Sequence, residues 1–263
     1  MDQAAPKYLA FGSRLLGVPE VLTLGVRPNF HDYSPQEQQK IHGASVILYP
    51  TLNYAQFFTT MGKKIFPSLE TYLYADEKMK QTTLFNLLAL PHPRTRFYLQ
   101  REFHRIEEDF AFPFIAKIPR ASARGRGVFL ITSSGDLEQY LRITKIAYIQ
   151  EYIPHDRDLR VILINYEPVL AYWRKRASAD FRTNLYQGGE IDFDNIPHDI
   201  MPMVQEFARQ CNFNDVGLDL LEHQGTWYLI EANMQYGRQG FKKKNLVLKE
   251  IIRRKLLTGS LFD

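Results

Sequence analysis

The spacing of apolar and polar residues predicts a short α/β segment at the start of the chain. Residues 34–37 read Ser-Pro-Gln-Glu, a helix-start box in which Ser caps the helix, Pro takes its first position and Glu follows three residues after the cap. The apolar run 44–49 predicts a strand that ends at Pro50. A helical pattern over 76–90 ends at the Pro-His-Pro of residues 91–93, which cannot continue a helix.

The remainder of the chain is rich in predicted strands. Apolar or alternating segments predict strands at 112–118, 128–132, 147–152, 159–165, 168–174, 216–221 and 227–233. Gln224 and Gly225 supply the turn between the last two strands. Helices are predicted at 135–143 with Ser134 as cap, at 199–211, and at 245–257 with an apolar stripe of Val247, Leu248, Ile251 and Ile252. We therefore expect an α+β fold with mostly antiparallel sheet, not a doubly wound parallel sheet.

Composition narrows the class of protein. Of the 263 residues, 45% are hydrophobic and 24% are charged, which is typical of an ordinary globular protein. The single cysteine, Cys211, excludes an internal disulfide and a thiolate-rich metal site, and it fits a reducing compartment. No apolar run reaches the roughly 18 residues of a membrane helix, and the N-terminus does not read as a secretory signal. We therefore expect a cytoplasmic protein that does not enter a membrane.

The net charge of +4 is unevenly placed. Residues 238–263 hold eight Lys or Arg and two Asp or Glu, a balance of +6, so the rest of the chain sums to −2. A basic tail on a near-neutral body argues against DNA as a partner, since a DNA-binding face spreads positive charge over the fold. The tail is either a solvated helix face or a positive rim that attracts an acidic substrate.

The last predicted hairpin carries candidate metal ligands. Glu231 and Asn233 are two residues apart on one strand and share a face, and Asp219 lies across from them on the preceding strand. Carboxylate and amide oxygens are the ligands that Mg²⁺ prefers. Two carboxylates about 4 Å apart would repel by roughly 4 kcal/mol at an effective dielectric near 20. We therefore expect a metal to neutralise them, unless both point to solvent on an exposed sheet face.

Lys117 is the second chemical signal. It lies inside an apolar strand, where an unpaired ammonium is costly to bury. The basic loop 120–127, with Gly125 and Gly127, follows it and allows close approach to a ligand. A strand lysine and such a loop suit nucleotide phosphates, although the loop matches neither Walker A nor GxGxxG. The alternative is an edge lysine whose ammonium reaches water.

Four segments in order resemble the ATP-grasp superfamily, and most closely its ribosomal-protein glutamate ligase (RimK-type) branch. They read PFIAKI…RGRGVFLI, YIQEYI…DLRVILIN, RKRASADFRTNLYQGG and VGLDLL…WYLIEAN, and they cover the chain from about Lys78 to Asn245. The resemblance implies two α+β subdomains that clamp ATP, here 76–146 and 147–263, after a short α/β domain at 1–75. It also implies a ligase that activates a carboxylate as an acyl phosphate, which an amine attacks to give an amide, ADP and phosphate.

The resemblance further implies roles for individual residues. The expected nucleotide ligands are Lys117, one of Lys78 and Lys80, Glu151 and Tyr152 at the adenine, Asp158 at the ribose, and Arg182 and Asn184 near the γ-phosphate. The expected ligands of two Mg²⁺ or Mn²⁺ ions are Asp219, Glu231 and Asn233. Arg174 and Arg182 would act at the transfer site, and residues 122–127 would form the lid.

The substrates stay open at this point. After Asn233 the chain reads Met-Gln-Tyr-Gly, whereas the RimK branch usually has Ser-Pro-Gly, so the amine is not identified. Glutamate or another amino acid, joined to a peptide, a protein tail or a small molecule, is the first hypothesis. An ATP-grasp kinase that phosphorylates a hydroxyl, or a non-catalytic nucleotide-binding module, are the alternatives. The sequence leaves a homo-oligomer open.

Overall fold

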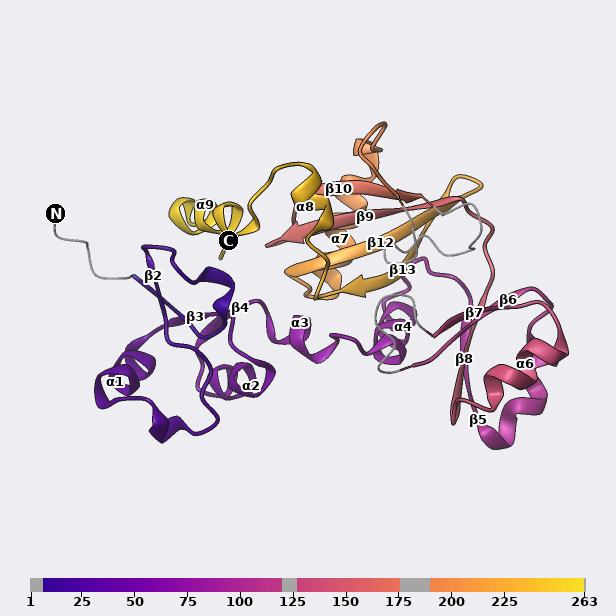
Figure 1. The fold of residues 1–263 in the computed structure, drawn as a ribbon, viewed down its shortest axis with the longest axis horizontal. Coiled ribbons are helices and arrows are strands. Elements are labelled where there is room, and N and C mark those ends of the chain that lie inside the picture. The colour runs from indigo at the N-terminus through magenta and orange to yellow at the C-terminus, as the bar shows by residue number, and fades with distance from the viewer. Residues whose placement is uncertain (1–6, 120–126, 176–189, 263) are drawn as a thin grey trace.

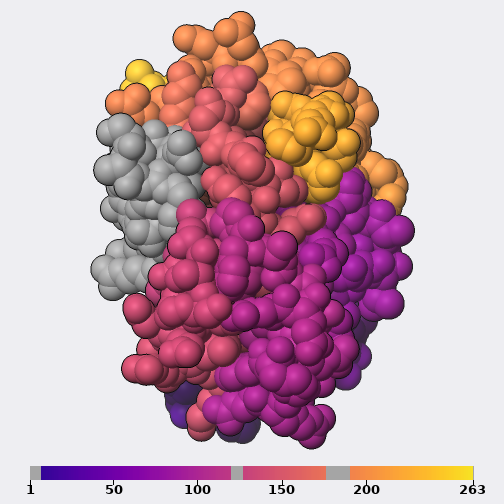
Figure 2. Space-filling model, turned by 90° about the vertical axis from the view of Figure 1, so that its right-hand side faces the viewer, coloured from indigo at the N-terminus to yellow at the C-terminus, as the bar shows by residue number. Residues whose placement is uncertain are grey.

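A computed structural model describes residues 7–119, 127–175 and 190–262. The described residues form three sheets, which we call N-terminal, central and C-terminal by their order along the chain. In space, the C-terminal sheet (β9–β13) lies between the N-terminal sheet (β1–β4) and the central sheet (β5–β8) (Figure 1). With the molecule turned by 90° so that the right-hand side of Figure 1 faces the viewer, the central segment lies below the orange part of the C-terminal segment (Figure 2). In the described part of the chain, no helix combines the length and the apolar character needed to cross a membrane.

The N-terminal sheet is small and parallel, with strand order β2-β1-β3-β4. Its strands are β1 (Tyr8–Ala10), β2 (Val21–Thr23), β3 (Val46–Leu48) and β4 (Lys64–Phe66), and its helices are α1 (Pro35–Gly43), α2 (Leu52–Thr60) and α3 (Leu69–Leu73). The predicted start of α1 is confirmed: the Ser34 side chain accepts from the Glu37 amide, and the Glu37 side chain accepts from the Ser34 amide.

The central sheet is antiparallel, with strand order β5-β8-β6-β7. Its strands are β5 (Thr95–Leu99), β6 (Phe114–Lys117), β7 (Val128–Ile131) and β8 (Ile146–Glu151). The helices of this segment are α4 (Lys78–Leu87), α5 (Ile106–Asp109) and α6 (Ser134–Leu141). The predicted cap of α6 is wrong by one residue, because the Ser133 side chain accepts the Asp136 amide and Ser134 is already helical.

The C-terminal sheet is also antiparallel, with strand order β11-β10-β9-β12-β13. Its strands are β9 (Arg157–Ile164), β10 (Glu167–Lys175), β11 (Glu190–Asp192), β12 (Asp215–His223) and β13 (Thr226–Asn233), and its helices are α7 (Met201–Gln210), α8 (Gln239–Lys243) and α9 (Leu248–Thr258). Gln224 and Gly225 form the predicted turn, with φ of 51° and 77°. The expected α+β fold with mostly antiparallel sheet is therefore confirmed, and only the N-terminal sheet is parallel.

The two faces of the C-terminal sheet have different neighbours. One face packs against α7 and α4 through residues such as Leu159, Val161 and Leu218. On the other face, Ile162, Ile164 and other apolar residues pack against the N-terminal sheet and α9. The charged part of that second face, beyond the apolar half, is where the candidate site lies.

The basic C-terminal segment holds the N-terminal domain in place. Arg253 on α9 forms a bidentate ion pair with Glu20, at 2.8 and 2.9 Å, and Lys255 pairs with Glu167. Lys255 is buried, so this part of the tail is not the solvated face expected from the sequence. In the predicted stripe of α9, Leu248 and Ile252 are buried and Ile251 is partly buried, but Val247 is exposed.

Candidate functional site

A β-bulge aims the predicted metal ligands at one face of the C-terminal sheet. Asp219 pairs with Glu231 while the next residue, Leu220, pairs with Leu229, so Ile230 is an extra residue on β13. Leu229 and Glu231 are two residues apart and would share a face in a regular strand. Because of the extra residue they point to opposite faces: Leu229 packs in the core against α7, and Glu231 lies on the other face. The structure thus brings Asp219, Glu231 and Asn233 together, as the sequence predicts.

Asp219 is buried and accepts hydrogen bonds from three side chains. Arg160 donates through Nε to Oδ1 at 2.6 Å and through Nη2 to Oδ2 at 2.7 Å. Arg174 reaches Oδ2 at 3.0 Å and Asn233 reaches it at 2.9 Å. Burial opposes ionisation of Asp219, but the two guanidinium groups prevail and hold its pKa below the usual range.

Arg174 links two acidic side chains. Its Nε and Nη2 donate to both oxygens of Asp158, at 2.6 and 2.8 Å, and Nη2 also reaches Asp219. Arg174 and Asp158 are directly opposite each other on β10 and β9, so the register sets this pair. All three side chains are less than 10% exposed. Such a buried, fully paired network resists rearrangement.

Two lysines approach from the other elements. Lys78, on α4, lies 3.1 Å from Glu231. Lys117, on β6, is buried with its Nζ 5.4 Å from the centroid of the Tyr148 ring. Burial lowers the pKa of Lys117 to about 8; Glu231 opposes this shift, and the nearby Lys78 adds to it. The central sheet and α4 therefore bring two lysines close to the carboxylates of the C-terminal sheet.

We call this group the charged cluster; its members are Lys78, Lys117, Asp158, Arg160, Arg174, Asp219, Glu231 and Asn233. It holds four cations and three carboxylates, a net charge of +1 among the described residues. Asp219 and Glu231 are thus paired with cations of the chain itself, and the metal expected at these carboxylates stays a prediction. The surplus positive charge suits a polyanionic ligand.

The oxygen atoms of the cluster nevertheless fit a hard divalent cation. Among the described residues, Asp219 Oδ1 accepts a single hydrogen bond, Glu231 pairs through Oε1, and Asn233 uses its amide nitrogen. Within the described ranges, no three His, Cys, Asp or Glu gather as a metal site. Two carboxylates and an amide match Mg²⁺, which commonly takes one or two carboxylates and completes its shell with water and phosphate oxygens.

The other predicted residues fall in different places. Lys80 is half exposed and pairs with Glu77 at 3.8 Å, so of the two candidate lysines on α4 only Lys78 joins the cluster. Glu151 ends β8, and its carboxylate accepts from the backbone amide of Arg94. Tyr152 follows it, partly buried, on the connection between the two antiparallel sheets. Arg182, Asn184 and most of the predicted lid, residues 122–126, lie outside the described residues.

Two functional contacts were missed from the sequence. Arg160 was quoted only as part of a motif, although it lies two residues after Asp158 on β9 and therefore shares its face. That spacing was the available signal. Tyr148, whose ring lies beside Lys117 and whose hydroxyl bonds to Thr82 at 2.8 Å, gave no such signal, because only the pairing of β6 with β8 brings it there.

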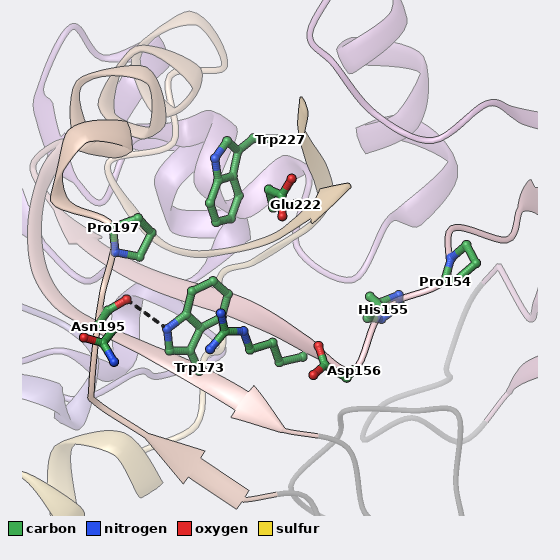
Figure 3. A pocket seen from close by; sticks show the side chains of 9 residues that line it. Pro154, His155, Asp156, Trp173, Asn195, Pro197, Glu222 and Trp227 are labelled. Atoms are coloured by element: carbon green, nitrogen blue, oxygen red, sulfur yellow. Dashed lines mark hydrogen bonds between the residues drawn. The ribbon is translucent and has the colours of Figure 1, made fainter. Parts of the chain in front are cut away.

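A separate hollow of about 420 Å³ lies on the other face of the C-terminal sheet (Figure 3). The rings of Trp173 and Trp227 line it with Glu222, and the Arg157 guanidinium lies 4.0 Å from the Trp173 ring. Trp173 precedes Arg174 on β10, so strand alternation points the two side chains to opposite faces. The hollow is therefore distinct from the charged cluster.

Comparisons with known proteins agree on one family. The family model described as the RimK-like ATP-grasp domain matches residues 75–254. The coenzyme γ-F420-2:α-L-glutamate ligase of Methanococcus maripaludis is 28% identical over 184 residues, which cover 66% of this chain and 64% of that protein. A probable α-L-glutamate ligase of Pseudoalteromonas atlantica is 24% identical over 208 residues, covering 76% of this chain and 68% of the relative. The chain thus spans just under two thirds of the F420 ligase.

A solved structure confirms the fold. The ATP-grasp ligase PsnB, complexed with a minimal precursor, Mg and ADP, superposes with a TM-score of 0.71 at 14% sequence identity. The match covers 97% of this chain and 98% of PsnB. The ATP-grasp fold expected from the sequence is therefore correct, including the short N-terminal domain that precedes the two antiparallel sheets.

Proposed function

This chain belongs to the RimK-like ATP-grasp family, and from that premise we propose that it is an ATP- and Mg²⁺-dependent ligase that joins a carboxylate to an amine. The charged cluster is the observation that supports this activity most directly. Two antiparallel sheets and α4 place lysines, arginines and oxygen ligands around one point, and phosphoryl transfer needs such charge neutralisation and positioning more than it needs a covalent residue.

The proposed reaction has two steps. An oxygen of the substrate carboxylate attacks the γ-phosphorus of ATP, the bond to the bridging oxygen breaks, and ADP leaves. The amine nitrogen then attacks the carbonyl carbon of the acyl phosphate, inorganic phosphate leaves with the bonding pair, and the nitrogen loses a proton. The products are an amide, ADP and phosphate, and neither step requires an oxidant or a reductant.

The cluster supplies positive charge on both sides of the reacting phosphorus. We assign Lys117 and Lys78 to the α- and β-phosphates, because they project from the central sheet and from α4. Arg174 would face the transferred phosphoryl group, with its Nε and Nη2 fixed by Asp158 and Asp219. A guanidinium fixed in this way requires no reorganisation when charge develops on the phosphate.

We further propose that Asp219, Glu231 and Asn233 hold two Mg²⁺ ions, for which Mn²⁺ can substitute. The bound ions would neutralise phosphate charge and align the γ-phosphate for attack. The contacts of Glu151 and Tyr152 with adenine, of Asp158 with ribose, and of Arg182 and Asn184 with the γ-phosphate stay predictions. Arg182 is also proposed, with Arg174, as a residue of the transfer site.

The substrates follow from the relatives as a proposal. Relatives are named α-L-glutamate ligases, and PsnB is described with a precursor peptide. We propose that the amine comes from glutamate or another amino acid and that the carboxylate belongs to a peptide, a protein tail or a small acceptor. We place the reaction in the cytoplasm, where ATP is available and the single buried Cys211 stays reduced.

The test is ADP release from purified protein with Mg²⁺-ATP, supplied with pairs of amino acids and short acidic peptides. Release should require both a carboxylate and an amine, and mass analysis should show a product heavier by one amino acid. Adding hydroxylamine in place of the amine should yield a hydroxamate, since hydroxylamine traps acyl phosphates. A phosphorylated hydroxyl product that survives hydroxylamine would instead identify a kinase.

Matched lysine variants give the control. Lys117→Met should abolish ATP binding and turnover, whereas Lys80→Met, which removes an exposed lysine from α4, should leave both unchanged. A wild-type protein that does not bind Mg²⁺-ATP, or a Lys117→Met variant that binds it normally, contradicts the proposal.

A further inference from the structure

A second polar cluster lies on the same face of the C-terminal sheet, where the N-terminal domain meets it. Arg14, in the loop after β1, donates through Nη1 to Asp215 at 3.1 Å and to the Tyr236 hydroxyl at 3.3 Å. Tyr236 donates to the other Asp215 oxygen at 2.5 Å. The guanidinium carbon of Arg14 lies 5.0 Å from the centre of the Tyr49 ring and 5.6 Å from that of Tyr236. We call these four residues the Arg14 cluster.

This cluster is aligned with the proposed metal ligands. Asp215, Gly217 and Asp219 are successive residues on one face of β12, so Asp215 lies about 13 Å from Asp219 along the strand. Tyr236 packs over Gly217 between them, since a Cβ at position 217 would lie 3.0 Å from the Cβ of Tyr236. Tyr236 itself follows Asn233 by three residues. The Arg14 cluster and the charged cluster are therefore two ends of one sheet face.

Two groups in the Arg14 cluster have unused hydrogen-bonding capacity. Arg14 bonds through Nη1 alone within the described residues, its side chain is 25% exposed, and its Nε and Nη2 form the paired donors that match a carboxylate. The hydroxyl of Tyr49 is buried beside Asp215 and has no partner with hydrogen-bond geometry among the described residues. A buried polar atom without a partner is unusual in a native protein, and next to a guanidinium with free donors it is available to a ligand.

The charge of Asp215 does not prevent an anion from binding here. Arg14 already balances it, and Tyr236 donates to it. Burial also raises the pKa of Asp215, which weakens its repulsion of a second carboxylate. The remaining neighbours, Tyr49 and Tyr236, are neutral at physiological pH because burial raises the pKa of both hydroxyls.

We propose that Arg14 and the Tyr49 hydroxyl bind the free α-carboxylate of the amino acid that supplies the amine. This inference rests on the proposed function. In that reaction one carboxylate is phosphorylated at the charged cluster. The Arg14 guanidinium contacts Asp215, about 13 Å along β12 from Asp219, so it would bind a second carboxylate that stays unreacted. The substrate class is thus an α-amino acid with a free carboxylate, oriented with its amine toward the charged cluster.

The test compares an amino acid with its α-amide. With L-glutamate, or whichever amino acid supports ADP release, the wild-type protein should have a KM at least tenfold lower than with the α-amide of the same amino acid. Arg14→Lys keeps the charge but loses the paired donors, so it should raise the amino-acid KM at least tenfold and reduce that preference, with the ATP KM unchanged.

A hydroxyl pair separates binding from folding. Tyr49→Phe removes only the unpartnered hydroxyl and should raise the amino-acid KM several-fold without lowering the melting temperature. Thr23→Val removes the other buried hydroxyl that makes no hydrogen bond in the described part of the chain, on β2, and should change neither quantity. Tyr49→Phe thereby tests the inference even if Arg14 variants fold poorly.

The outcomes distinguish the two proposals. If the wild-type protein releases ADP with an amino acid but Arg14→Lys and Tyr49→Phe keep its KM and its preference for the carboxylate, this inference is overturned and the proposed function stands. If no amino acid stimulates ADP release from the wild-type protein, the proposed function fails, and the inference falls with it.

Discussion

The ammonium of Lys117 is buried at a cost to stability, and removing it should make the protein more stable. The pKa of Lys117 falls from 10.5 to about 8, first because it is buried and also because Lys78 is near. Methionine has similar length and no charge, so Lys117→Met keeps the packing beside the Tyr148 ring and removes the buried charge. The substitution should stabilise the fold and at the same time abolish nucleotide binding.

The magnitude follows from the proton affinity. A tenfold change in affinity is worth about 1.4 kcal/mol, so a pKa of about 8 in place of 10.5 corresponds to about 3 kcal/mol at pH 7. The unfolded chain binds more protons than the folded chain between about pH 8 and pH 10.5. The contribution of Lys117 to wild-type stability should therefore become more favourable as pH rises across this window, and the advantage of Lys117→Met should shrink to near zero above it.

Urea unfolding of both proteins at pH 7 and at pH 10.5 measures this difference. Other groups that titrate in the same range, such as tyrosines, contribute equally to the free energy of unfolding of both proteins, so their contribution cancels in the difference. Lys80→Met, on the exposed side of α4, is the matched control and should unfold like the wild-type protein at both pH values. The reasoning is refuted if Lys117→Met is no more stable than the wild type at pH 7, or if its advantage is the same at pH 10.5.

Three further changes test other contacts. Ser34→Ala removes the cap of α1 and should cost about 1 kcal/mol in urea unfolding with ADP release intact; a larger loss would mean the box does more than cap. Arg160→Met leaves the buried Asp219 with fewer donors and should cost about 3–5 kcal/mol, whereas Arg160→Lys should cost less, and equal losses would argue against the bidentate pair. Deleting Ile230 makes Leu229 and Glu231 neighbours, and alternation then keeps Glu231 opposite Asp219, so Mg²⁺-dependent nucleotide binding by calorimetry should survive the deletion, as it should in Ile230→Ala; loss of binding in the deletion alone would contradict this reading of the register.

Much of the fold was predictable because its signals are local. The box at residues 34–37, the turn at Gln224 and Gly225, and the alternation along β9 and β10 each depend on neighbours within a few residues. Strands β1, β2, β4, β5 and β11 were not predicted. All but β5 have three residues, and such short strands are defined by their partners and carry little pattern of their own.

The candidate site was predictable in its members but not in its charge balance. Glu231 and Asn233 could be placed on one face from their spacing, and Lys117 was conspicuous as a polar residue in an apolar strand, but the bulge at Ile230 that puts Asp219 opposite Glu231 carries no sequence signal. The sequence does not show which cations pair with the carboxylates, because the β9–β12 register is what brings Arg160 to Asp219. These cations already pair with the carboxylates, and the metal expected there stays a prediction.

The chain's local patterns were enough to predict the longer strands of the C-terminal sheet, the turn at Gln224 and Gly225, and which side chains could bind phosphate or metal, since these depend on spacing of 2 or 3.6 residues and on side-chain chemistry. Only the tertiary structure decided which charges meet. It selected Lys78 over Lys80, joined Arg174 to two carboxylates, and placed Arg14 beside Asp215, 201 residues away in the sequence. Electrostatic energy depends on distance in space, and strand register and domain packing, not sequence separation, determine that distance.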